Sequence, residues 1–97
     1  MDLSKELKVA LNTGKVEIGY KVAIKTLVKK KAKLVVVSSD MPESLLANIK
    51  TTAGDVPLHK YSGSSWELGG LCGKPYHVTT ITIIEPGESS ILAIKEG

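Results

Sequence analysis

A run of four apolar residues at positions 34–37, Leu-Val-Val-Val, constrains the fold of this chain most strongly. β-Branched residues favour strands, and a strand without alternating polar residues is typically covered on both faces. This strand therefore predicts helices above and below a sheet. Helical and strand patterns alternate along the rest of the chain, which indicates an α/β protein folded as a three-layer α/β/α sandwich. Since 97 residues suffice for one modest core, we expect a single domain over residues 1–97.

The stretch from Gly14 to Lys33 precedes this run and contains a second glycine, Gly19, at which its apolar period changes. Residues 15–18 alternate between charged and apolar side chains, which is typical of a half-buried strand. From residue 20 the apolar residues recur every three or four positions, which predicts a helix with one buried face. Lysines recur at every fourth position on another face. The residues of the two faces are Tyr20, Ala23, Ile24, Leu27 and Val28, and Lys21, Lys25 and Lys29, respectively.

Gly19 stands where the expected strand becomes the expected helix. The first N–H groups of a helix lack partners within it and carry partial positive charge. Glycine also allows another backbone to approach closely. A glycine turn, a helix start and a row of lysines together suit a polyanion, so RNA is our first hypothesis for the partner. Lys25 fits a solvated helix face equally well, and Tyr20 is expected to be mainly a core residue with its hydroxyl at the surface.

Two further helices are expected in the first half of the chain. Residues 2–13 predict a helix with Asp2 as its N-cap and with Gly14 in the left-handed conformation that ends it. A helix is also expected after the 34–37 strand, capped by Ser39 or Asp40 and stopped by Gly54.

The second half predicts two strands, at residues 56–61 and 78–84, and a short helix between them. Ser64 and Glu67 have the spacing of a capping box that opens this helix. Gly69 and Gly70 inside so short a helix cost stability, so we expect a close backbone neighbour there. Trp66 has no assigned function; partial burial is the default interpretation and an interface role is the alternative. A last turn of helix is expected around residues 91–94.

Composition narrows the classes of function. The net charge is +3, the pI is near 9.0, and all 13 basic residues are lysines, which lack the planar fork of arginine. Recognition of an acidic partner is therefore expected to depend on shape, backbone groups and apolar contacts. No apolar run approaches the roughly 20 residues that span a bilayer, and the N-terminus has no signal-peptide pattern, so we expect a cytoplasmic protein without membrane contact. Cys72 is alone, and neither His59 nor His77 belongs to a metal motif, so no metal or other cofactor is expected.

Four segments carry a family resemblance. They are Thr-Gly-Lys-Val-Glu-Ile-Gly-Tyr-Lys at 13–21, Ala-Lys-Leu-Val-Val-Val at 32–37, Glu-Leu-Gly at 67–69 with Gly-Lys at 73–74, and Glu-Pro-Gly-Glu-Ser at 85–89. In order and spacing they closely resemble the L-thirty-e family of archaeal and eukaryal large-subunit ribosomal proteins. The resemblance covers nearly the whole chain. This family belongs to the L-seven-Ae superfamily of RNA-binding proteins that recognise kink-turns.

The resemblance implies a four-stranded mixed sheet and an RNA site made by three loops at one end of it. In the family these loops meet an internal loop of RNA that bends sharply and contains sheared G·A pairs and an extruded base. By analogy, Gly19 and Lys21 approach the bent backbone, while Tyr76 and Val78 pack against exposed bases. The residues that we expect to bind RNA are Gly19, Tyr20, Lys21, Lys25, Asp40, Lys74, Tyr76 and Val78.

Two positions depart from the wider superfamily. Lys21-Val22 stands where other kink-turn binders have Asn-Glu, and Asp40 stands where the eukaryal form has asparagine. A carboxylate accepts hydrogen bonds but does not donate them, so Asp40 is equally well explained as a helix cap.

The resemblance predicts a non-enzymatic protein of the large ribosomal subunit, monomeric when free, with ribosomal RNA and neighbouring ribosomal proteins as partners. The alternative within the superfamily is a kink-turn protein of small RNA-guided modification or processing particles. Two other classes are a small α/β enzyme and a protein-binding adaptor. Against the enzyme, the sequence shows no Ser-His-acid set and no phosphate-cradling glycine motif. An adaptor leaves the lysine row without a purpose.

Overall fold

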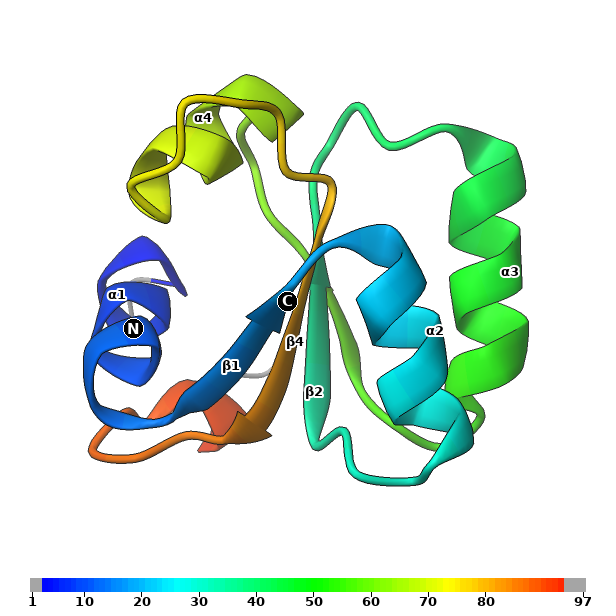
Figure 1. Cartoon of the computed structure of the whole chain (residues 1–97), viewed down its shortest axis with the longest axis horizontal. Helices are drawn as coiled ribbons and strands as arrows, with labels where there is room; N and C mark the ends of the chain where they lie inside the picture. The colour runs from blue at the N-terminus through cyan, green and yellow to red at the C-terminus, as the bar shows by residue number, and fades with distance from the viewer. Residues whose placement is uncertain (1–2, 94–97) are drawn as a thin grey trace.

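A mixed four-stranded sheet separates two layers of helices in the computed structural model, which describes residues 3–93 (Figure 1). The predicted α/β/α sandwich is therefore confirmed. Its elements, in chain order, are α1 (Leu3–Thr13), β1 (Lys15–Ile18), α2 (Tyr20–Val28), β2 (Leu34–Val37), α3 (Glu43–Ala53), β3 (Leu58–Lys60), α4 (Ser65–Leu71), β4 (Thr80–Glu85) and the 3-10 helix η1 (Ile91–Ala93).

The sheet has the strand order β1-β4-β2-β3. Strand β4 runs antiparallel to both β1 and β2, whereas β2 and β3 are parallel. The C-terminal ends of β1, β2 and β3 therefore meet the N-terminal end of β4 at one end of the sheet. We call this end the loop rim; it consists of residues 19–21, 38–41, 61–66 and 74–79.

Strand β2 is central, as its sequence predicts, and all four of its residues are buried. Leu34 and Val36 belong to a core with α1, α4, β4 and η1, while Val35 and Val37 belong to a second core with α2 and α3. Figure 1 shows the same division, with α1 and α4 on one side of the sheet and α2 and α3 on the other. Each layer thus buries one apolar helix face against the sheet.

Gly14 does not adopt the predicted left-handed conformation. The glycines with a positive φ are Gly19, Gly54, Gly73 and Gly87. A Cβ atom at Gly14 would lie 2.1 Å from the carbonyl oxygen of Glu85. Glycine is required here by the close approach of two backbones, not by its dihedral angles.

Other boundaries also differ from the prediction. Helix α3 begins after Pro42 without a side-chain cap, so neither Ser39 nor Asp40 caps it. Val28, the last residue of α2, is 67% exposed, so the buried face of that helix ends with Leu27. The two later strands are shorter than predicted, at Leu58–Lys60 and Thr80–Glu85. The predicted Asp2 cap and residue 94 lie outside the described residues.

Within residues 3–93, no helix combines the length and the apolar character needed to cross a bilayer.

Candidate nucleic-acid interface

Backbone hydrogen bonds bring the three predicted loops together at the loop rim. The N–H of Gly19 donates to the carbonyl of Thr80 at 2.9 Å, and the N–H of Ser38 donates to that of Thr79 at 2.9 Å. The N–H of Val78 donates to the carbonyl of Ser65, also at 2.9 Å. Residues 78–80 therefore connect the loops that carry Gly19, Asp40 and Tyr76. All three lie at one end of the sheet.

The first loop places an open helix start at the rim. Gly19 has φ 120° and ψ 149°, a conformation that is essentially restricted to glycine. Helix α2 has no side-chain cap, and a Cβ atom at Gly19 would meet nothing within 4 Å. Lys21, in the first turn of α2, is exposed. The positive end of α2 and one ammonium group therefore face open space.

Tyr20 and Lys25 occupy different positions on the same helix. The Tyr20 hydroxyl accepts a 2.5 Å hydrogen bond from Asn48 Nδ2 of α3, and its ring packs partly against the α2–α3 core. Tyr20 is half-buried, so it packs at the edge of the core with its hydroxyl at the surface, and the expectation of a mainly buried residue is met only in part. Lys25 is exposed one turn farther along α2 from the rim.

The third loop is fixed by close backbone packing against α4. A Cβ atom at Gly69 would lie 2.0 Å from the carbonyl oxygen of Tyr76, and the N–H of Lys74 donates to the carbonyl of Gly69 at 2.9 Å. The expected close neighbour is confirmed for Gly69 but not for Gly70, where an added Cβ would meet nothing within 4 Å. The Tyr76 side chain is 51% exposed on this fixed loop, next to the exposed Lys74. Its ring is therefore presented by a backbone that α4 holds in place.

Val78 lies on the same loop but faces inward. It is 2% exposed and belongs to the core formed with α1, α4 and β4. Its side chain offers almost no surface to a base, so its position does not support the expected packing of Val78 against exposed bases. Val78 instead attaches the loop to the core.

Asp40 caps a different helix from the predicted one. Its Oδ1 accepts from the N–H of Ser65 at 2.8 Å, and its Oδ2 accepts from the Ser65 hydroxyl at 3.1 Å. The neighbouring Ser38 hydroxyl lowers the pKa of the Asp40 carboxyl from its ordinary value of 3.8; the Ser65 groups add to this, and desolvation partly opposes it. Both carboxylate oxygens thus stabilise the start of α4 and tie it to the β2–α3 loop.

Ser65 also contacts His77, so an aspartate, a serine and a histidine meet at the rim. The distance from Ser65 Oγ to His77 Nδ1 is 2.8 Å. In a catalytic triad the histidine stands between the acid and the nucleophile, whereas here the serine stands between the other two. Ser65 is moreover 6% exposed, so its hydroxyl is shielded from a substrate. The arrangement holds two loops on α4 and has neither the order nor the access of a nucleophilic site.

Sequence reasoning missed this group because its members are distant in the chain. Asp40 and Ser65 are separated by 25 positions, and Ser65 and His77 by 12. The nearby signal was the capping box, which is confirmed by the 3.2 Å bond from the N–H of Glu67 to Ser64 Oγ. The capping box predicts where α4 starts, but it does not predict that Asp40, from the β2–α3 loop, binds Ser65 there.

Trp66 is more exposed than expected. It is 56% exposed, and its ring centroid lies 5.2 Å from that of His77 at an interplanar angle of 51°. Together with Tyr76, the rim therefore presents three aromatic side chains from α4 and the loop that follows it.

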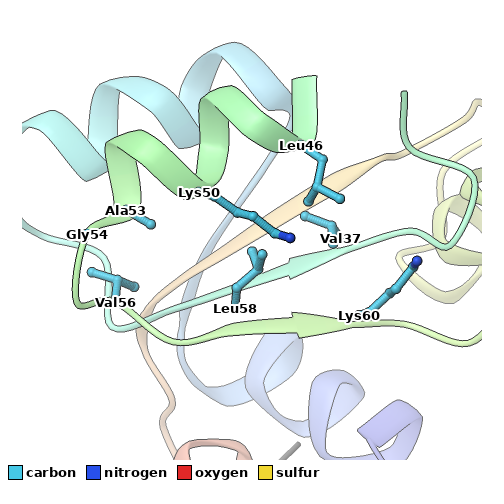
Figure 2. Close-up of a pocket in the computed structure, with 8 residues that line it drawn as sticks. All are labelled: Val37, Leu46, Lys50, Ala53, Gly54, Val56, Leu58 and Lys60. Atoms are coloured by element: carbon cyan, nitrogen blue, oxygen red, sulfur yellow. The ribbon is translucent and has the colours of Figure 1, made fainter. Parts of the chain in front are cut away.

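A separate depression of about 420 Å³ lies between α3 and the edge strand β3 (Figure 2). Apolar side chains such as Leu46 and Leu58 form its walls, and Lys50 reaches from α3 over the sheet. Among the residues described, neither acid, histidine, cysteine nor hydroxyl side chains line it. It therefore lacks the paired groups of general acid–base or nucleophilic catalysis.

The described chain also offers little for metal or thiol chemistry. No group of three His, Cys, Asp or Glu side chains within residues 3–93 is placed to hold a metal ion. Burial raises the pKa of the Cys72 thiol, with Lys74 partly opposing the shift, and Cys72 packs against the α1–α4 core. This environment favours the protonated, less reactive form of the thiol.

Comparison with protein families identifies the chain. The model of the Ribosomal protein L7Ae/L30e/S12e/Gadd45 family matches residues 1–93. The chain belongs to this family. It is a family of ribosomal proteins and not of enzymes, so the predicted family and the predicted absence of enzymatic activity agree with it.

Individual relatives agree with this assignment over almost their full lengths. The chain is 45% identical to large ribosomal subunit protein eL30 of Sulfurisphaera tokodaii over 97 residues, covering 95% of this chain and 90% of the relative. It is 47% identical to the eL30 protein of Sulfolobus acidocaldarius (94% and 90% covered) and 38% identical to that of Methanosphaera stadtmanae (99% and 100% covered). A solved structure from Bacillus halodurans, described as a protein of unknown function, shares the fold with a TM-score of 0.80 at 21% identity, covering 95% of this chain and 93% of that one.

Proposed function

We propose that this chain is a structural protein of the large ribosomal subunit whose loop rim binds and stabilises a kink-turn-like internal loop of ribosomal RNA. The observation that carries the proposal is the convergence of the open α2 start, Lys21 and Tyr76 at one end of the sheet. The eL30 relatives support the ribosomal part of the proposal, and the family resemblance supports the kinked RNA.

The chemistry of the rim suits a sharply bent RNA. Bending brings two phosphate backbones close together, and ammonium groups with a positive helix end reduce their repulsion. Lys21 and the α2 start supply these charges next to Gly19, where an incoming backbone meets no side chain. Proteins that read RNA sequence usually bind unpaired bases on aromatic side chains, and the half-exposed ring of Tyr76 supplies such a surface.

Rigidity favours the same function. The Tyr76 loop is fixed by Gly69 and Ser65, and the Asp40 loop is fixed by Ser65. A surface that is ordered before binding loses less conformational entropy when the RNA arrives. The rim is thus suited to selecting one bent shape of RNA instead of adapting to many.

Partners and location follow from this function. Ribosomal RNA and adjacent ribosomal proteins are the partners, and the ribosome in the cytoplasm is the location, as it is for a large-subunit protein. The chain acts as a single RNA-binding domain that is monomeric when free.

A titration with matched RNAs tests the proposal. One RNA contains an asymmetric internal loop with sheared G·A pairs and an extruded base, and its control is the same stem fully paired. We expect tight binding to the first RNA alone, with an affinity that falls with salt at a log–log slope of ~0.7–0.9 per phosphate neutralised. Equal affinity for both RNAs, or a flat salt response, would contradict the proposal.

Co-sedimentation separates the ribosomal function from its alternative. At moderate salt we expect the protein to sediment with large ribosomal subunits and to crosslink to their RNA. Sedimentation with small RNA-guided modification particles would move the protein to that branch of the superfamily. RNA crosslinks in neither fraction would exclude both functions.

A further inference from the structure

Trp66 is the one tryptophan of the chain, and it is left 56% exposed at the loop rim. Tryptophan carries the largest apolar surface of any side chain, so its burial usually contributes strongly to stability. Because more than half of the Trp66 side chain remains exposed, its burial contributes little to the stability of the folded protein. Its ring centroid lies 5.2 Å from that of His77.

The positions of both rings are fixed by Ser65. Trp66 follows Ser65 directly at the start of α4, and the N–H and hydroxyl of Ser65 both bind Asp40. His77 Nδ1 lies 2.8 Å from the same hydroxyl. Since the single hydroxyl proton of Ser65 is donated to Asp40, His77 Nδ1–H is the donor in that bond, and Nε2 is the remaining polar atom of the ring. The two rings are therefore held by the folded loops and do not depend on a flexible segment.

The geometry of the pair leaves aromatic surface available. At an interplanar angle of 51° the rings are tilted, so His77 does not cover a face of the indole as a parallel stack would. Tyr76 precedes His77 on the same loop and is itself 51% exposed, and Lys74 lies two residues earlier. Flat rings beside a cation are the combination that binds unpaired nucleotides, because a base stacks on the ring while the cation meets its phosphate.

We propose that Trp66 and His77 form a second base-stacking position, which takes an unpaired nucleobase flanking the kinked element. This inference rests on the proposed function, since it assumes that RNA occupies the rim. Trp66 supplies the stacking face, and His77 supports the indole and presents Nε2 to a polar edge of the base. The kinked RNA therefore binds more tightly when it carries a single-stranded nucleotide next to the stem than when it ends in a closed pair.

Because the chain has one tryptophan, its fluorescence reports on this position directly. Two RNAs are compared, one kinked element with an unpaired flanking nucleotide and one without it, each carrying a fluorescent label for anisotropy. We expect anisotropy to show binding of both RNAs, and Trp66 emission to be quenched strongly by the flanked RNA only. Binding of both RNAs with equal and weak quenching would overturn the inference and leave the proposed function standing. Absence of binding by either RNA would reject the proposed function, and the inference with it.

Substitution of the ring provides an independent readout. Trp66→Leu keeps apolar bulk but removes the flat surface, and we expect it to weaken binding of the flanked RNA by about 5- to 150-fold, the range that corresponds to losing one stacked base. The same variant is expected to bind the unflanked RNA as the parent protein does, and Trp66→Phe is expected to recover part of the loss. The thermal midpoint should stay unchanged because the side chain is mostly exposed. If Trp66→Leu binds both RNAs normally but no longer sediments with ribosomal subunits, Trp66 contacts a protein and the inference is wrong.

Discussion

Gly19 at the loop rim and two glycines at the opposite end of the sheet have contrasting surroundings. At the end away from the loop rim, Cβ atoms at Gly14 and Gly87 would collide with backbone atoms, at 2.1 Å from Glu85 O and 2.4 Å from the carbonyl carbon of Thr13. We call this end the glycine corner; it consists of Glu6, residues 13–14 and residues 85–90. At the loop rim, a Cβ at Gly19 would meet nothing within 4 Å. The glycine corner is close-packed, whereas open space lies beside Gly19; a Cβ atom at Gly69, by contrast, would collide with the Tyr76 carbonyl of the same rim.

Hydrogen bonds reinforce the contrast. At the glycine corner the N–H of Glu88 donates to Thr13 Oγ1 at 2.9 Å, Ser89 Oγ donates to the carbonyl of Glu6 at 2.6 Å, and the N–H of Ser90 donates to Glu6 Oε1 at 2.8 Å. These bonds join residues that are 75 to 84 positions apart in the chain. The polar groups of the glycine corner thus hold the two ends of the described chain together. The Glu-Pro-Gly-Glu-Ser segment at 85–89 therefore has a structural role here and does not by itself indicate a binding site.

The largest effect is expected at the glycine corner. Gly14→Ala places a methyl group against the Glu85 carbonyl, which is backbone and cannot rotate away, so we expect a loss of about 3 kcal/mol or more in the free energy of unfolding. The matched control is Gly70→Ala, in open space within α4, which should stabilise the protein by about 0.5–1 kcal/mol. Urea denaturation measures both changes. Equal effects of the two alanines would show that the corner is not close-packed.

Removal of the Tyr76 ring is the next largest change, and it should affect binding instead of folding. Tyr76→Ala is expected to cost about 1–3 kcal/mol of affinity for the kinked RNA, because one stacked base loses its platform. Tyr76→Phe keeps the ring and should bind as the parent protein does. RNA affinities from anisotropy decide between the two outcomes. If Tyr76→Ala binds the kinked RNA with unchanged affinity, no base stacks on the Tyr76 ring.

Removing the charge of one lysine should have a smaller effect on RNA binding, and only a lysine at the loop rim should show it. Lys21→Ala at the rim is expected to lower the salt slope of RNA binding by ~0.7–0.9, the value for one phosphate contact, with little change in thermal midpoint. The control is Lys33→Ala; Lys33 is exposed just before β2, at the end of the sheet away from the rim. Its salt slope should equal that of the parent protein. A similar change for both variants would mean that only net charge matters.

Acid should weaken the rim through Asp40. The pKa of its carboxyl is below 3.8 in the folded protein, so the carboxylate contributes stability above its unfolded pKa and loses that contribution as the pH falls through the folded value. In Asp40→Asn the side-chain amide does not ionise, so this contribution to the pH dependence of stability is absent. The difference in unfolding free energy between the parent protein and Asp40→Asn should be constant near neutral pH and should shrink as the pH falls below about 3.8. Denaturation at a series of pH values measures it, and a difference that stays constant in acid would show that Asp40 does not act as a charged cap.

The layers of this fold were predictable because burial leaves a periodic trace in the sequence. The unbroken apolar run of β2 predicted helices on both faces of the sheet. The change of apolar period at Gly19 predicted the turn between β1 and α2. The position of Tyr76 on the same rim came from the family resemblance. Three details were not predictable: the packing around Gly14, the capping of α4 by Asp40, and the inward direction of Val78. Each depends on residues far apart in the chain that meet only after folding, and such contacts have no period or spacing.

The central claim is that the loop rim, and not another surface, meets the RNA. Backbone amide chemical shifts, recorded by NMR during titration with the kinked RNA, test it most directly. We predict the largest shifts at Gly19, Lys21 and Tyr76, with the amides of Glu88 and Ser90 at the glycine corner unmoved. Shifts centred on the glycine corner or on the depression between α3 and β3, with the rim unmoved, would contradict the account.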